Sequence, residues 1–416
     1  MLRAGALIYS LAVAVIVGLL SSGLVFYAFH AQLSLDYNQQ TLRLTDNAAS
    51  GIQWLLSEGA QAGATRRVQD LYGNATDTVV LQAAPWGVFQ KLTATALWRN
   101  NRFSQVALAG QGVEPEGGVA LYLADQNQPL SLCGRTVVKG RCQLPKAGPK
   151  RAYIEGQNYV GDRLIYGSVT TSQRQVPALA IQHFAELDYI NGRQSLEESL
   201  LKWDNLTVDS LSHSFRRKTV LLYSDQSIAL TRQRLSGNLR IVSRNSVFIG
   251  RQARLDNVIV TAPRVTVEAG FEGNLQIFAS DSIAVEEGVL LNYPSALVVE
   301  AKDGSGVGGI TIAEQARVAG CVVLQVPGVL PRSNWLLAIG PEAEIVGQVY
   351  AGHLLELKGS VLGTVWARQL YLKTPASVYG NHLLNATVDR SKLSPSFVGI
   401  SLKSATEKFK IAQWLE

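Results

Sequence analysis

The sequence predicts a mainly β protein with an N-terminal transmembrane helix, a helical stalk, a β-rich globular module and a C-terminal β-solenoid, also called a β-helix. Three observations carry this prediction. An uncharged apolar stretch lies near the N-terminus, strand-like segments separated by turn residues follow it, and a short apolar-alternating motif recurs every 16 to 19 residues in the C-terminal half. The 416 residues are enough to bury more than one hydrophobic core.

The transmembrane anchor is predicted at residues 1–30. Residues 4–29 carry no charge, and at about 1.5 Å per residue they can cross a hydrocarbon core of about 30 Å. A cleaved signal peptide is the alternative, but its apolar core would be shorter, at about 7 to 15 residues. Arg3 precedes the stretch and the next Lys or Arg is Arg43. The positive-inside bias therefore predicts single-pass anchoring in a bacterial inner membrane, with the bulk of the chain periplasmic or extracellular.

The helical stalk is predicted at residues 31–60, as a continuation of the anchor. Its apolar residues recur at roughly helical spacing, and no proline occurs before Pro85. A hydrophobic and then amphipathic N-terminal helix resembles that of type IV pilins, minor pilins and pseudopilins. The resemblance implies a helix that anchors the subunit and then packs in a filament core. The chain departs from this family, because it has no Gly-Phe-Thr-Leu-x-Glu processing motif and no glutamate in residues 1–57. An ordinary anchor with a helical stalk is the alternative.

The β-rich module is predicted at residues 74–190, where turn residues separate candidate strands at 78–82, 118–123, 135–138, 151–155 and 163–169. Cys133 and Cys142 bracket a hairpin-like stretch within it. We expect them to form a disulfide in an oxidising compartment, and two buried thiols are the alternative. Ser195 and Glu198 form a capping-box pattern, which predicts a short helix at residues 195–211. Residues 195–235 are therefore predicted to be a helical linker and the entry to the solenoid.

The solenoid is predicted at residues 236–375. Paired apolar residues at 247/249, 265/267 and 283/285 recur with a spacing of 18. A second series begins at Asn238, Asn257 and Asn274. Two short strands per repeat form one coil of a solenoid. The backbone N–H and C=O groups at the edges of a coil find hydrogen-bond partners only in a neighbouring coil.

The regular spacing does not extend over the whole C-terminal half. Residues 301–340, which include Pro327, Pro331 and Trp335, break the register and predict a loop or an irregular coil. Residues 376–416 are predicted to be a cap or a tail, with a weakly amphipathic segment at 405–415 that could cover the last coil.

The repeat becomes tighter near its end. Residues 344–351 align with residues 360–367 at a spacing of 16, with Gly, Val and Ala at equivalent places. This block resembles the bactofilin-like repeat. Bactofilins are polymer-forming bacterial scaffold proteins whose core is a right-handed β-helix, so the resemblance implies a non-enzymatic scaffold.

The sequence shows no arrangement of residues typical of a catalytic site. The acidic residues near the repeats are scattered, without a carboxylate pair or a histidine cluster. His353 is the one histidine inside the repeat, and we expect it to be a solvated or hydrogen-bonded turn residue. Gly304, Gly306 and Gly309 match a dinucleotide-binding motif, but a strand follows where a helix is required. We therefore expect no catalytic residue, no cofactor and no metal site.

Charge gives little reason to expect nucleic-acid binding. The net charge of +6 is spread along the chain, and the tight basic clusters lack interleaved aromatic residues. Outward arginines in the early coils predict a solvated face: Arg240, Arg244, Arg251, Arg254 and Arg264.

The sequence thus favours a non-enzymatic, membrane-anchored, extracytoplasmic scaffold or assembly protein of a bacterial envelope or pilus-like machine. Its expected partners are membrane lipid, through residues 4–29, and other proteins or further copies of the chain. The alternative is a membrane-tethered carbohydrate-binding or carbohydrate-cleaving β-helix. Partners that co-purify would favour the scaffold, whereas turnover of a polysaccharide would favour the alternative.

Overall fold

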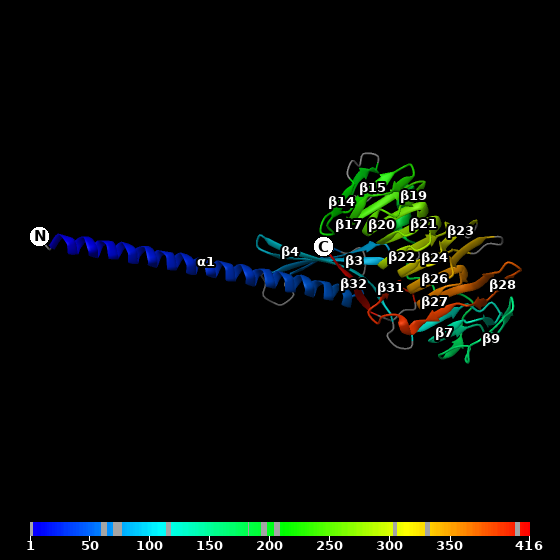
Figure 1. Cartoon of the computed structure of the whole chain (residues 1–416). Coiled ribbons are helices and arrows are strands. Elements are labelled where there is room, and N and C mark those ends of the chain that lie inside the picture. Colours follow the sequence, from blue (N-terminus) through cyan, green and yellow to red (C-terminus); the bar gives the residue numbers. More distant parts are fainter. Residues whose placement is uncertain are drawn as a thin grey trace. The chain divides into compact units, whose positions relative to one another are not determined.

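Figure 1 shows the computed structural model, which describes residues 3–59, 65–69, 77–113, 118–181, 183–192, 198–203, 209–302, 306–328, 333–403 and 408–416. The chain divides into two compact units. The first comprises Met1–Trp54, Thr65–Gln82 and Thr93–Gln105, and the second comprises Leu55–Ala64, Ala83–Leu92 and Val106–Glu416. The protein is mainly β, with one long apolar helix at its N-terminal end.

Helix α1 (Arg3–Ser57) covers the predicted anchor and nearly all of the predicted stalk without interruption. It is 55 residues long. Within the described residues, it is the one helix long and apolar enough to cross a membrane. Residues 5–39 of this helix are exposed, and buried positions begin only at Leu44. The helix therefore has an unpacked N-terminal part and a packed C-terminal part.

The packed part of α1 and a sheet form the core of the first unit. Strands β1 (Thr65–Gln69), β2 (Thr78–Trp86), β3 (Phe89–Trp98) and β4 (Asn101–Gly112) are neighbours in that order, and β1 pairs with β2 in antiparallel fashion. Leu44, Ala48, Gly51 and Ile52 are buried at helical spacing. A Cβ atom on Gly51 would lie 2.7 Å from Leu81 Cδ2 and 3.0 Å from Ala94 Cβ. Glycine at this position therefore lets the helix approach the sheet closely.

A stack of parallel strands dominates the second unit. In Figure 1 its arrows follow one another in colour order from green to orange. Its pairings join into one closed sheet. The strands from the central and C-terminal sequence are β12 (Val169–Thr171), β13 (Ser199–Lys202), β14 (Ser210–His213), β15 (Val220–Ser224), β16 (Ile228–Leu230), β17 (Arg234–Gly237), β18 (Leu239–Ser243), β19 (Ser246–Ile249), β20 (Arg254–Val267), β21 (Glu272–Val285), β22 (Leu290–Glu300), β23 (Val307–Ile312), β24 (Arg317–Gln325), β25 (Asn334–Ile339), β26 (Glu344–Leu357), β27 (Ser360–Lys373) and β30 (Thr387–Asp389). Strand β28 (Val378–Gly380) pairs with β27 in antiparallel fashion.

Register in the stack follows the apolar repeat. Val247 is the register partner of Val265, and Val265 is the partner of Ile283. All three are about 1% exposed. The same column continues through Ile310, Leu337, Leu355 and Leu370. The 18-residue spacing therefore identified residues that lie one above another in a single hydrophobic core.

Glycines in the tighter repeat lie where the backbones of neighbouring strands leave no room for a side chain. Gly320, Gly347 and Gly363 are successive register partners. Gly347 has a φ of 151°, and a Cβ atom there would collide with the carbonyl oxygen of Gly320. A larger residue would force neighbouring strands apart, which explains the matched glycines of the two aligned segments.

Part of the predicted middle module belongs to the stack. Strand β5 (Val119–Leu123) pairs in parallel with β27, and β7 (Val137–Lys139) pairs in parallel with β30. Strand β8 (Arg141–Leu144) then pairs with β5 and with β12. In Figure 1, β7 lies beyond β27. The expectation of a separate module at residues 74–190 is therefore corrected. Irregular spacing in this region hides the repeat.

Short elements complete this end of the stack. Strand β29 (His382–Leu384), β6 (Leu130–Cys133) and β9 (Pro149–Arg151) form a three-stranded sheet, and β10 (Tyr153–Ile154) and β11 (Gln157–Asn158) form a pair. Of the strands expected in this region, residues 163–169 contribute only Val169, at the start of β12.

The helix predicted at residues 195–211 is not found in its described residues, which lie in 198–203 and 209–211. Strand β13 pairs in parallel with β15, and β14 pairs in parallel with β17. Residues 195–197 and 204–208 lie outside the described residues. The backbone groups at the end of a stack need partners, and this ladder overrides the local capping pattern.

Of the two alternatives predicted for residues 301–340, the loop is corrected and the irregular repeat is confirmed. Strand β23 pairs with β21 and β25, and β24 pairs with β22 and β26, all in parallel. Trp335 is 6% exposed and belongs to the core of the stack. The repeat is longer here, because Ile283 has Ile310 as its register partner, whereas Val265 has Ile283. Pro331 falls outside the described residues.

The C-terminal segment is a strand of a sheet other than the parallel stack. Strand β32 (Phe409–Leu415) pairs with β4 in antiparallel fashion, as does β31 (Val398–Gly399). Strand β5 pairs with β27 instead, so the cap predicted for residues 405–415 is corrected for the residues that the structure describes, which begin at 408. Pairing with an open sheet edge determines the conformation of this segment.

Candidate functional sites

The exposed part of α1 is the first candidate site. Its large apolar side chains are open to solvent on all sides of the helix: Leu7, Leu11, Ile16, Leu20, Leu24 and Tyr27 are each between 56% and 74% exposed. Covering a large apolar side chain is worth about 1.5–3 kcal/mol relative to leaving it in water. A helix that is hydrophobic all round is normally buried in a membrane or among other helices.

A polar band follows the apolar stretch. Asp36, Gln39, Gln40 and Arg43 lie on α1 and, with Trp98, line a small hollow of about 240 Å³ in the first unit. Asn101 Nδ2 donates a hydrogen bond to Gln40 Oε1 at 3.3 Å. The helix thus becomes polar where it meets the sheet of its own unit.

Asp77, the residue before β2, holds the polar part of α1. Its Oδ2 lies 2.6 Å from Arg43 Nε and accepts a hydrogen bond from Asn47 Nδ2 at 2.9 Å. The Asp77 side chain is 6% exposed, so its carboxylate is largely shielded from water, whereas Arg43 is 44% exposed. This clamp fixes the helix where it begins to pack.

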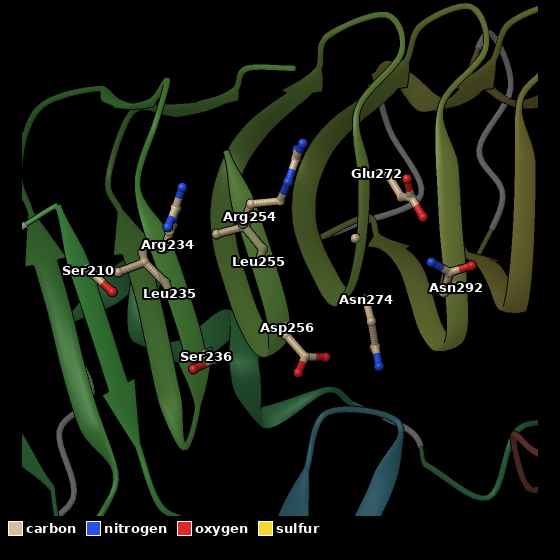
Figure 2. A pocket seen from close by; sticks show the side chains of 11 residues that line it. Ser210, Arg234, Leu235, Ser236, Arg254, Leu255, Asp256, Glu272, Asn274 and Asn292 are labelled. Atoms are coloured by element: carbon tan, nitrogen blue, oxygen red, sulfur yellow. The ribbon is translucent and has the colours of Figure 1, made fainter. Parts of the chain in front are cut away.

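A groove on the parallel stack is the second candidate site. It has a volume of about 540 Å³ and is lined by residues of β14, β17, β20, β21 and β22. Figure 2 shows Arg234 and Arg254 extending in the same direction from neighbouring strands, and Asp256 and Asn274 at the other end of the groove. Arg234 pairs with Arg254 in the ladder, and Asp256 pairs with Asn274. Polar lining residues therefore occupy corresponding register positions on neighbouring strands.

Side-chain amides organise the lower part of this groove. Asn257 Nδ2 donates to Asp256 Oδ1 at 3.2 Å, and Asn274 Nδ2 donates to Asn257 Oδ1 at 3.3 Å. Asn257 adopts a left-handed conformation, with φ of 56°, which asparagine tolerates better than most residues. Partial desolvation of the Asp256 carboxyl group raises its pKa. The Asn series in the sequence marked this corner of the coil, but not the groove.

Arg240 does not belong to a solvated basic face. Its side chain is 9% exposed, and its Nη1 lies 2.9 Å from Glu186 Oε2. It also lies over the rings of Trp86 and Tyr189, at 5.1 and 4.9 Å from their centroids. Desolvation opposes the charge, but Glu186 and its neighbours outweigh it and raise the pKa of Arg240. Sequence patterning could not predict this ion pair, because Glu186 is distant in sequence.

The other arginines of the predicted basic face differ in their contacts. Arg244 forms an exposed ion pair with Asp225 at 2.7 Å. Arg251, Arg254 and Arg264 are exposed. The expected solvated face therefore holds for these residues but not for Arg240.

His183 was not singled out from the sequence. Its Nδ1 lies 2.8 Å from Glu300 Oε1, and its Nε2 lies 2.8 Å from Asp188 Oδ1. These hydrogen bonds, with that to Glu300 first, raise the pKa of His183. Glu300 also accepts a hydrogen bond from the backbone of Phe184. His183 therefore acts as a clasp between the end of β22 and the short 3-10 helix η1 (Ala185–Asn191).

The predicted disulfide between Cys133 and Cys142 is corrected, because both thiols are free and buried. Cys133 Sγ contacts the carbonyl oxygen of Gln157 at 2.9 Å in a small cluster with Leu372. Cys142 lies in the main core of the stack, where burial raises its pKa to about 12. The two side chains thus occupy different hydrophobic clusters. Cys321 is a buried residue, as expected.

His353 lies in β26 rather than at a turn. Its Nδ1 is 3.0 Å from the carbonyl oxygen of Trp335, and desolvation lowers its pKa. The hydrogen-bonded character expected of it is thus observed. Gly309, from the motif that resembled a dinucleotide-binding loop, lies in β23 and pairs with Leu336. Gly304 lies outside the described residues.

No family model and no curated protein matches the chain. Among solved structures, the chain is similar to the competence-associated pilin ComZ from Thermus thermophilus, at 9% sequence identity, over 90% of this chain and 98% of that chain. The TM-score is 0.27, which is too low to support an inference about this chain. Function is therefore inferred from the geometry and chemistry described above.

Proposed function

We propose that the protein is a non-enzymatic, membrane-anchored scaffold or assembly subunit of a bacterial envelope or pilus-like machine. One observation carries the proposal: α1 is a single helix whose apolar N-terminal part is uncovered while its C-terminal part packs on a sheet. Lipid or neighbouring helices are the environments that suit the uncovered part. The continuous helix then connects the membrane or filament that holds this part to the folded part of the chain.

The orientation follows from charge. Arg3 is the one charged side chain on the N-terminal side of the apolar stretch, and the polar band with Asp36 and Arg43 lies on the other side. In our proposal the N-terminus is cytoplasmic and the remainder is periplasmic or extracellular. The anchor lies in the inner membrane before any assembly step.

The parallel stack serves, in this proposal, as a β-solenoid that presents a rigid surface. Backbone hydrogen bonds join its strands across successive coils, and its core is a continuous column of aliphatic side chains. Such a body tolerates little internal motion, which suits a spacer or a docking platform better than a site that must close around a substrate.

Membrane extraction tests the anchoring. Membranes from cells that produce the full chain are washed with alkaline carbonate, and the protein should remain in the membrane pellet. A V17R/L20R variant should shift to the supernatant, since each arginine at the centre of the span costs about 2.5–3.5 kcal/mol. The matched control, L35R/L42R, places the same charges beyond the span and should stay in the pellet. A wild-type protein found in the supernatant would contradict the proposal.

A carbohydrate-active β-helix is the second candidate, favoured by the polar groove on the stack. Incubation with polysaccharides separates the two. A scaffold should release no new reducing ends, and the full chain should co-purify with protein partners or with further copies of itself. Turnover that disappears in Asp256→Asn or Glu272→Gln would replace the scaffold by an enzyme.

A further inference from the structure

We propose that the groove lined by Arg234, Arg254, Ser236, Asp256, Glu272 and Asn274 binds an extended glycan chain that is neutral or of balanced charge. The groove is lined by residues of the second unit, and none of its lining residues belongs to α1, on which the proposed function depends. The two proposals can therefore fail separately.

The repeat of the lining fits a ligand that is itself a repeating polymer. Arg234 and Arg254 are register partners, as are Ser236 and Asp256, and then Asp256 and Asn274. Neighbouring strands lie about 4.8 Å apart, so polar side chains at corresponding register positions recur at that step, although their chemistry differs from strand to strand. This step is comparable to the length of one pyranose unit. Successive sugars thus meet a polar side chain on each successive strand.

The lining supplies the hydrogen-bonding groups that hydroxyl-rich ligands need. Arg234 and Arg254 are donors, Asp256 and Glu272 are acceptors, and the amide of Asn274 is both. Hydrogen bonds from Asn257 and Asn274 hold the Asp256 corner in place before any ligand arrives. Preorganised polar groups lose less entropy on binding than mobile ones.

The charges in the groove argue against nucleic acid as its ligand. The two arginines are matched by two carboxylates, Asp256 and Glu272, so the lining has no net positive charge. None of the residues that line the described groove is aromatic, so bases would have no ring on which to stack. A polymer with many hydroxyl groups and little net charge meets both conditions.

Affinity electrophoresis and sedimentation test this site with the full chain in detergent micelles. The probes are insoluble peptidoglycan and chitin, soluble dextran, and a double-stranded DNA fragment. We expect retention by at least one glycan. Arg254→Ala and Asp256→Ala should each weaken it at least tenfold. Binding to peptidoglycan alone would identify a cell-wall source, and binding to dextran would identify a soluble polysaccharide.

Matched controls keep the result specific to the groove. Arg264→Ala lies on the same strand as Arg254, and Glu287→Ala removes another exposed carboxylate. Both variants should bind like the wild type, and circular dichroism should show that all four variants are folded. Absence of glycan retention, or retention equal in groove and control variants, would overturn the proposal. Retention of the DNA alone would also overturn it.

Discussion

The position of a residue in the parallel ladder determines whether its side chain is buried or exposed. Val265 faces the interior beside its register partners Val247 and Ile283, whereas Thr266, the next residue, is partly exposed. Alternate residues of a strand point to opposite faces. The same substitution is therefore severe at an inward position and harmless at the next, outward position. Arg240 is the instructive exception, since its charge is buried but paired.

Val265→Asp should destabilise the second unit by about 3–5 kcal/mol, because it buries a carboxylate with no partner. Thermal unfolding followed by circular dichroism measures the effect. Thr266→Asp, on the outward face, should change stability by no more than about 1 kcal/mol. Equal melting temperatures for the two variants would contradict the interior assignment of Val265.

Arg240→Met should also destabilise the protein by about 3–5 kcal/mol, because Glu186 would remain buried without its counter-ion. Arg244→Met is the control. Its ion pair with Asp225 is exposed and screened by solvent, so its loss should change stability far less than the loss of the buried pair. Denaturant titration of both variants gives the comparison, and a loss at position 240 no larger than at position 244 would contradict the buried pair.

His183 should make stability depend on pH. Hydrogen bonds to Glu300 and Asp188 raise its folded pKa above the unfolded value of about 6.5. The stabilisation is therefore fully present below the unfolded pKa and is lost as the pH rises through the folded pKa. The difference in melting temperature between the wild type and His183→Gln should shrink as the pH rises above about 6.5. A constant or growing difference would show that the clasp does not require the charged imidazole.

At the scale of elements, α1 changes role along its length. Its exposed residues 5–39 have no packing partner within the described chain, and the part from Leu44 onward lies against the sheet of the first unit. Gly51 marks this change, since glycine inside a helix costs about 1 kcal/mol relative to alanine and needs a compensating contact. Close approach to Leu81 and Ala94 supplies that contact.

Gly51→Leu should destabilise the first unit by about 1–3 kcal/mol, because the new side chain must displace Leu81 or the strand that carries it. Gly18→Leu is the matched control, since no atom lies within 4 Å of a Cβ at that position. Hydrogen exchange of β2 and β3 in the detergent-solubilised chain should rise in the first variant only. Equal protection in both variants would contradict the close packing.

The sequence predicted some elements well and others not at all. The charge-free stretch and the period of 18 identified α1 and the column through Val247, Val265 and Ile283, because both signals are local. The pairing of Leu121 with Val365 has no local signal. Tertiary pairing also overrode local preference at β13, where a capping pattern had favoured a helix, and it placed β32 on a sheet edge rather than over the repeat.

The candidate sites were predictable to different degrees. The exposed helix follows directly from composition. The groove does not, because Arg234, Asp256 and Asn274 meet only once the register is known. His183 and Glu300 are 117 positions apart, so their contact lay beyond any sequence pattern.

At the scale of the whole molecule, we propose that the uncovered part of α1 is an assembly surface as well as an anchor. In a membrane, the hydrophobic effect does not drive apolar helices together, because lipid tails are equally apolar. Helices that associate therefore do so through close side-chain packing on one specific face. Such a face has a period of about 3.6 residues. An anchor without assembly has no preferred face.

Site-specific photo-cross-linking tests this claim most directly. A diazirine side chain is placed in turn at each position from 13 to 24 of the full chain, in native membranes. If α1 is an assembly surface, protein adducts should recur at positions three and four residues apart, on one face of the helix. Adducts to lipid alone at all twelve positions would contradict it, and would leave α1 as a simple anchor.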